Sequence, residues 1–122
     1  MESKTVFSFA WEGTAVGIND KPNRGNAKVN NPAYNLFIDD IAFTCRAATR
    51  ARGIERRLFI EIRQLIDRAR DADSLVKPIF DGIERSAVIA DDNQLRDFSV
   101  STFDKERGRL DQIQVIARLN NV

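Results

Sequence analysis

Acidic residues and a lysine in the second half of this 122-residue chain have a spacing that could bind a metal ion. Asp71 and Asp73 stand just before an expected helix, Lys77 follows Asp73 on the same helix face, and Asp92 comes at a later turn. If Asp92 folds against the other two, each pair of carboxylates about 4 Å apart costs on the order of 4 kcal/mol at an effective dielectric constant of about 20. Such a cluster takes up protons or binds a hard cation, Mg²⁺ or Mn²⁺. With Mg²⁺ bound, Lys77 could neutralise a scissile phosphate during phosphodiester hydrolysis.

A structural interpretation of the same residues is equally open from their spacing alone. Asp73 is well placed as the N-cap of a helix, and Asp91 and Asp92 are typical of a turn. Asp71 could simply pair with Arg70 or Arg68.

The residue types that the chain lacks narrow the chemistry further. There is no histidine, which excludes Ser/His/Asp triads and histidine-ligated zinc. The single cysteine, Cys45, excludes an internal disulfide and a four-cysteine zinc site, and its place on an apolar stripe indicates a buried side chain. An enzyme built from this sequence must therefore use carboxylates, lysine, arginine, hydroxyls or a metal.

Basic residues concentrate in the segment 46–70, where every one of them is an arginine. The guanidinium fork matches phosphate geometry, so this choice suits a polyanion. The arginines expected to contact DNA are Arg46, Arg50, Arg52, Arg56 and Arg57. The formal net charge of only +1 favours ordinary surface arginines instead.

The hydrophobic pattern predicts one α+β domain over residues 1–122 that would position these side chains. Strands are expected at 5–11, 57–65, 95–104 and 110–119, and helices at 32–51 and 74–86, with a long polar loop at 12–31. Gly53 is expected to close the first helix. The order β-α-β-α-β-β predicts a mixed sheet with two main helices packed on it. No apolar run approaches the roughly 18 residues of a membrane span, so a soluble protein of a reducing compartment is expected.

The acidic motif resembles the signature of the RusA-type Holliday junction resolvases, small endonucleases of bacteria, phages and prophages. That signature reads approximately R-D-x-D-N-x-x-K-x-x-x-D-x-L, then a short gap, then D-D-x-Q-V. Residues 70–83, followed by 91–95, resemble it, and the resemblance covers 70–95 well. The chain departs from the pattern at Ser74, where the family usually has Asn, and at Gly82, where it usually has Ala.

The resemblance implies an Mg²⁺-dependent endonuclease, with Mn²⁺ able to substitute, that acts as a homodimer on four-way DNA junctions in recombination and repair. It implies no membrane and no small-molecule cofactor, and a place in the cytoplasm of a bacterial or phage-infected cell. The positions matching the metal ligands are Asp71, Asp73 and Asp92, Lys77 matches the catalytic lysine, and Asp81 and Asp91 rank behind them. If the usual Asn orients a metal ligand, Ser74 weakens the site. The alternatives are a non-catalytic junction-binding protein of the same fold and an interaction module unrelated to DNA.

Overall fold

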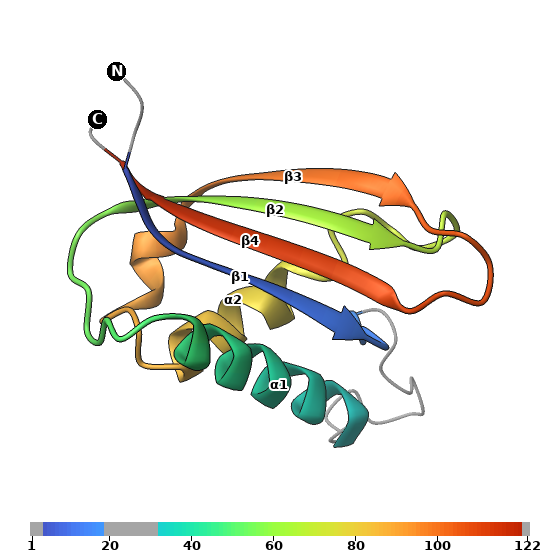
Figure 1. The fold of residues 1–122 in the computed structure, drawn as a ribbon, viewed down its shortest axis with the longest axis horizontal. Helices are drawn as coiled ribbons and strands as arrows, with labels where there is room; N and C mark the ends of the chain where they lie inside the picture. The colour runs from blue at the N-terminus through green and yellow to red at the C-terminus, as the bar shows by residue number, and fades with distance from the viewer. Residues whose placement is uncertain (1–3, 19–31, 121–122) are drawn as a thin grey trace.

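A four-stranded mixed sheet is covered on one face by two helices in the computed structural model, which describes residues 4–18 and 32–120 (Figure 1). Its elements are β1 (Thr5–Gly13), α1 (Pro32–Ala48), β2 (Leu58–Ile66), α2 (Val76–Arg85), the 3₁₀ helix η2 (Asp92–Leu95), β3 (Asp97–Asp104) and β4 (Asp111–Leu119). The predicted α+β class and the order β-α-β-α-β-β are therefore confirmed. Within the described ranges, no helix is long and apolar enough to cross a membrane.

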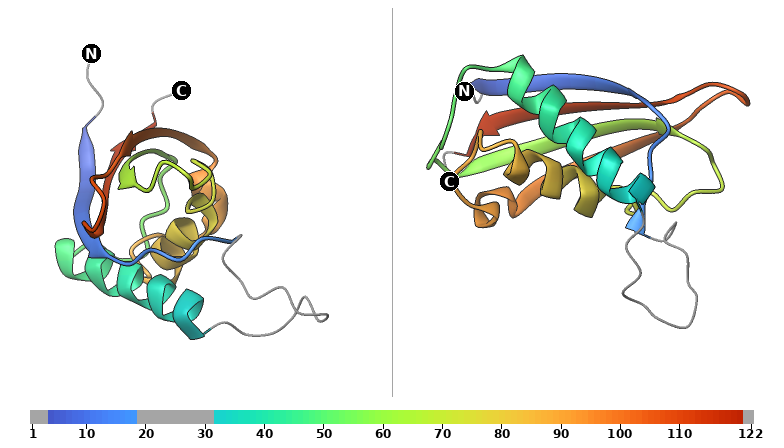
Figure 2. Two further views of the ribbon diagram at one scale, coloured as in Figure 1. Left: turned by 90° about the vertical axis from the view of Figure 1, so that its right-hand side faces the viewer. Right: turned by 90° about the horizontal axis from the view of Figure 1, so that it is seen from below.

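The strands lie in the order β1-β4-β2-β3, so that β1 and β3 form the two edges of the sheet. β4 is antiparallel to both β1 and β2, whereas β2 and β3 run parallel. Because parallel neighbours cannot be joined by a hairpin, the chain crosses over between them through α2 and η2. Figure 2 shows the curved sheet closing over both helices.

The core fills the space between the sheet and the helices. Every second side chain of β2 points into it. Leu58, Ile60 and Ile62 are fully buried there, while the residues between them face the other side of the sheet. The helices contribute Phe37, Ile41 and Cys45 from α1, and Ile79 and Ile83 from α2. Each such apolar side chain contributes about 1.5–3 kcal/mol by leaving water, and Cys45 is confirmed as a small buried hydrophobe.

Several predicted boundaries differ from the structure for local reasons. α1 ends at Ala48, and residues 53 and 54 instead donate backbone hydrogen bonds to the carbonyl oxygens of residues 87 and 88, at 2.9 and 2.8 Å. Gly53 adopts a positive φ of 64° in this connection rather than at the helix end. The N-cap of α2 is Leu75, without a side-chain cap, so the prediction that Asp73 caps this helix is wrong. Most of the predicted polar loop, residues 19–31, lies outside the described residues.

Candidate active site

A groove of about 580 Å³ lies between α2 and the edge strand β3. Four of the charged residues that the sequence singles out line it, namely Asp73, Lys77, Asp81 and Asp92. The first three follow one another at four-residue intervals along α2 and the turn before it, so they share one helix face. Asp92 comes from η2 and meets the same groove. The fold therefore brings the two acidic stretches of the sequence to one surface.

The remaining lining of this groove is apolar. Val76 and Phe80 contribute from α2, Phe98 and Val100 from β3, and Ile18 from the segment after β1. The rings of Phe80 and Phe98 meet edge to face, with centroids 5.0 Å apart and an interplanar angle of 86°. Charged groups thus stand beside an apolar, partly exposed surface.

Lys77 forms an ion pair with Asp81 along the helix, with Nζ 3.4 Å from Oδ1 and 3.5 Å from Oδ2. The side chains are 62% and 38% exposed, so the pair contributes only about 0.3–0.5 kcal/mol. The Lys77 ammonium can consequently leave Asp81 for a bound phosphate at little cost.

Glu84 is a member of this acidic surface that the sequence analysis did not single out. Partial desolvation raises the pKa of the Glu84 carboxyl above its ordinary value, and the nearby carboxylates of Asp92 and Asp81 raise it further. Hydrogen bonding of the protonated Glu84 carboxyl to Asp92 adds to this rise in its pKa. The signal for Glu84 was available, because it follows Asp81 by three residues and therefore lies on the same helix face.

η2 holds the second acidic stretch in place through a capping box. The side chain of Asp91 accepts from the backbone N–H of Asn93 at 3.0 Å, and this bond lowers the pKa of the Asp91 carboxyl below its ordinary value. Gln94 is buried and makes four hydrogen bonds: Oε1 accepts from two backbone N–H groups, and Nε2 donates to the carbonyl oxygens of Ile54 and Arg56, both at 2.7 Å. Asp91 therefore has a structural role, and Gln94 fixes where Asp92 lies.

A hydrogen bond from the buried side chain of Gln64 holds the turn before α2 in place. Gln64 donates from Nε2 to the carbonyl oxygen of Ala72 at 2.6 Å, between Asp71 and Asp73. Asp71 is not among the residues lining the groove. Ser74 is buried and faces Gly17, where an added Cβ would lie 2.9 Å from the Ser74 hydroxyl. Ser74 therefore packs against Gly17 in the interior and does not line the groove.

The expected convergence of three carboxylates is not present in the described part of the chain. Asp73 lies before α2 and Asp92 lies in η2 after it, and although both line the groove, Asp92 interacts with Glu84 rather than with Asp73 in the described residues. Among residues 4–18 and 32–120, no three acidic or cysteine side chains are arranged to hold a metal ion. The donor chemistry, carboxylate oxygens with excess negative charge, suits Mg²⁺, but the Asp71, Asp73 and Asp92 site remains a prediction.

The predicted DNA-contacting arginines lie in the last turn of α1 and in the connection between α1 and β2. Arg46 lies in the last turn of α1 and donates from Nη1 to the carbonyl oxygen of Ser86 at 3.3 Å. Arg52 donates to the backbone of its own loop, at 2.8 Å to the Thr49 carbonyl oxygen.

The other predicted arginines are Arg50, Arg56 and Arg57, of which Arg57 shares a surface hollow with Asn93 and Gln94 of η2. Arg57 pairs through Nε with Asp97 at 3.3 Å. The side chains of Arg50 and Arg56 are exposed and form no ion pair with a described residue. Because Gln94 binds the Arg56 carbonyl oxygen, this segment and Asp92 are held in a fixed relation. The Arg56 backbone and Arg57 therefore lie beside η2, the segment that carries Asp92.

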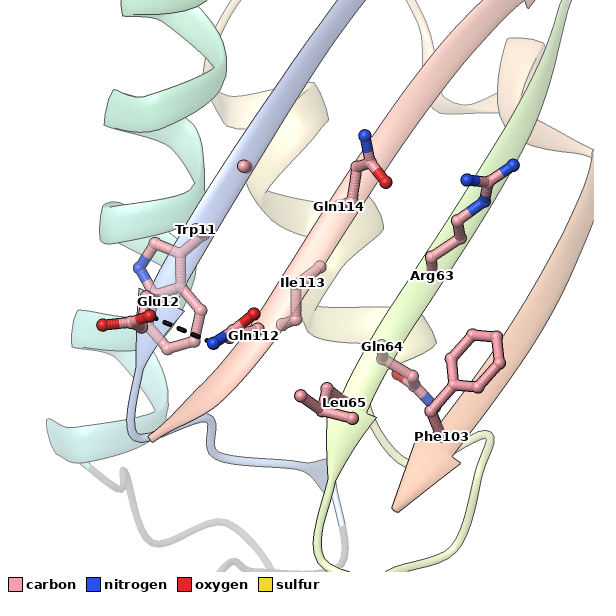
Figure 3. Close-up of a pocket in the computed structure, with 10 residues that line it drawn as sticks. Trp11, Glu12, Arg63, Gln64, Leu65, Phe103, Gln112, Ile113 and Gln114 are labelled. Carbon is pink, nitrogen blue, oxygen red and sulfur yellow. Dashed lines mark hydrogen bonds between the residues drawn. The ribbon is translucent and has the colours of Figure 1, made fainter. Parts of the chain in front are cut away.

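A second hollow, of about 500 Å³, lies on the face of the sheet that the helices leave open (Figure 3). Arg63, Gln112 and Gln114 point into it from β2 and β4, and Phe103 borders it from β3. Its charged lining residues are Glu12 and Arg63 among the described residues, and it contains none of the predicted catalytic residues. Of the predicted catalytic residues, Asp73, Lys77 and Asp92 line the groove beside α2 instead.

The sequence matches no known family model, and no curated protein matches it either. The assignment of a function consequently depends on the residues of the groove and on the motif resemblance.

Proposed function

We propose that this protein is a metal-dependent, structure-selective endonuclease that resolves four-way DNA junctions in the cytoplasm of a bacterial or phage-infected cell. The observation that carries the proposal is the meeting of Asp73, Lys77, Asp81 and Asp92 in one groove. These residues come from two stretches of sequence, and the resemblance to the RusA-type signature involves the same positions. Two nicks across a symmetric junction need two sites, which a homodimer supplies.

In this proposal, different residues have different roles in phosphodiester hydrolysis. Asp71, Asp73 and Asp92 would have to draw together to hold Mg²⁺, which would then supply Lewis-acid polarisation of a phosphate oxygen and an activated water. Lys77 leaves Asp81 and donates a charge-assisted hydrogen bond to the scissile phosphate. The arginines after α1 contact the flanking DNA backbone without reading its sequence.

The experiment is nicking of a synthetic four-way junction in Mg²⁺, compared with a linear duplex of the same sequence. The test variant is Asp92→Asn, and the matched control is Asp40→Asn, an exposed acidic residue of α1. We expect Asp40→Asn to retain wild-type activity and Asp92→Asn to lose roughly a hundredfold or more. Equal nicking by both variants would remove the carboxylate mechanism, and nicking of the linear duplex at the same rate would remove the selectivity for junctions.

One feature favours a non-catalytic alternative, an interaction module. The apolar lining and acidic rim of the groove also suit a cationic, apolar protein partner. This alternative predicts no nicking in Mg²⁺ or Mn²⁺ and no DNA binding at low salt. A junction-binding protein without catalysis would instead show salt-sensitive binding that persists in the absence of metal.

A further inference from the structure

Phe43 is the most exposed large hydrophobic side chain among the described residues, at 75%. It belongs to the outer side of α1, which no other described element covers (Figure 1). A side chain this exposed gains little from burial, and alanine has a higher helix propensity than phenylalanine. The stability of the fold therefore does not account for an aromatic ring at this position.

Arginines follow Phe43 at the C-terminal end of α1. Arg46 lies in the last turn of the helix, one turn beyond Phe43, and Arg50 and Arg52 come directly after its end. Arg50 is exposed and forms no ion pair with a described residue. Arg46 donates from Nη1 to the carbonyl oxygen of Ser86, and this contact ties its guanidinium to the end of α2. The ring of Phe43 thus stands at the border of a basic surface.

The other half of the exposed face of α1 has the opposite character. Leu36, seven residues before Phe43, is also exposed, at 64%, but the charged residues between the two are Asp39 and Asp40. Asp39 is neutralised by Arg85, whose Nη1 lies 2.6 Å from Oδ1. A polyanion is therefore attracted to the Phe43 end of α1 and not to the Leu36 end.

We propose that Phe43 stacks on an unpaired nucleobase while Arg46 and Arg50 contact the phosphates beside it. Every base offers a π face to an aromatic side chain, and arginines bind the backbone of the same strand, so this combination suits unpaired nucleotides. In a continuous duplex each base is paired and stacked, so the contact is available only where strands part. The inference rests on the proposed function for DNA as the ligand, and it gives the preference for branched over linear DNA a physical cause.

The first test measures binding of a fluorescein-labelled oligothymidylate to the full chain by fluorescence anisotropy, at low salt and with chelator. Phe43→Ala should weaken binding roughly five- to hundredfold, the loss expected when one base loses its stacking partner. Phe43→Trp keeps an aromatic face and should bind at least as tightly as wild type. The matched control is Leu36→Ala, which removes an exposed apolar side chain from the same helix and should leave the affinity unchanged.

The second test repeats the titration with an oligomer of the same length in which abasic sites replace the bases. Phe43→Ala should bind this oligomer as wild type does, because only the bases stack. Arg50→Gln should weaken binding to both oligomers and reduce the steepness of the salt dependence by roughly 0.7, the value for one phosphate of a single strand. Arg107→Gln, an exposed arginine between β3 and β4, controls for net charge and should leave the salt dependence unchanged.

Four results would overturn the proposal. The wild-type protein does not bind oligothymidylate at low salt, Phe43→Ala binds it as wild type does, or Phe43→Ala loses as much affinity for the abasic oligomer. Equal losses in Leu36→Ala and Phe43→Ala would instead assign this face of α1 to an apolar contact with another protein. Circular dichroism of each variant checks that it is folded.

These titrations are independent of the groove beside α2, because chelator prevents metal-dependent cleavage. Binding of oligothymidylate through Phe43 without nicking of junctions would refute only the nuclease proposal. Nicking of junctions by a protein whose Phe43→Ala variant binds oligothymidylate normally would refute only the stacking role of Phe43.

Discussion

Replacing Gly82 by alanine tests how closely the two helices approach each other. A Cβ at this position would lie 2.6 Å from Ile41 Cγ2, 2.7 Å from Ile41 Cβ and 3.0 Å from the carbonyl oxygen of Ile38. Two of these contacts involve atoms near the α1 backbone, so the helices must separate by several tenths of an ångström or more. Such overpacking costs about 1–3 kcal/mol, while alanine recovers up to about 1 kcal/mol of helix propensity. We expect Gly82→Ala to lower the free energy of unfolding by about 1–2 kcal/mol.

Urea denaturation followed by circular dichroism measures this change as a shift in midpoint at constant slope. Ala47→Gly, on the exposed face of α1, measures the propensity contribution alone. Adding Ile41→Ala to Gly82→Ala removes the Cγ2 contact but keeps Cβ, so it should not recover wild-type stability. A Gly82→Ala protein as stable as wild type would refute the close approach of α1 and α2 that this reasoning requires.

Three further predictions concern buried groups. Gln94→Leu abolishes four hydrogen bonds to backbone groups and should lower the free energy of unfolding by about 4 kcal/mol in urea titrations. Gln94→Glu should also destabilise the protein, because it turns a buried carboxylate oxygen toward the two carbonyl oxygens that Nε2 binds. The Lys105 ammonium lies 2.8 Å from the Asp111 carboxylate and is 18% exposed. Asp111→Asn removes this counter-ion and should lower the free energy of unfolding by about 3 kcal/mol. A decrease below about 0.5 kcal/mol would show that water solvates this pair. Burial raises the pKa of the Cys45 thiol, so a disulfide reagent should label it only as fast as the protein unfolds, and rapid labelling of the folded protein would contradict its burial.

The elements of this fold were predictable because each carries its own local pattern. The alternation of Leu58, Ile60 and Ile62 in β2 and the helical spacing of Phe37 and Ile41 in α1 both follow from which face each element buries. The strand order was not predictable, since it depends on pairing between residues far apart in the chain. The first turn of α2 also escaped prediction, because tertiary packing buries Leu75 as the N-cap.

The candidate site was predictable along α2 and less so across the groove. The four-residue spacing of Asp73, Lys77 and Asp81 places them on one face in any helix. The position of Asp92 depends on a contact that spacing cannot reveal, the hydrogen bonds from Gln94 to the segment after α1. Those bonds position η2 beside α2, which is why Asp92 lies close to Glu84.

The charge of the groove decides which measurement separates its possible functions. Asp73, Asp81, Glu84 and Asp92 line or adjoin it, and among the described residues Lys77 is the cation that balances them. A phosphate about 5 Å from one of these carboxylates is repelled by roughly 1–3 kcal/mol, so DNA enters only if a divalent cation offsets the repulsion. A nuclease should therefore bind junctions more tightly in Ca²⁺, which supports binding without turnover, than in chelator. A groove for a cationic protein partner should bind that partner less tightly when divalent ions are added. The sign of the metal effect on affinity, and not the affinity itself, distinguishes the two functions.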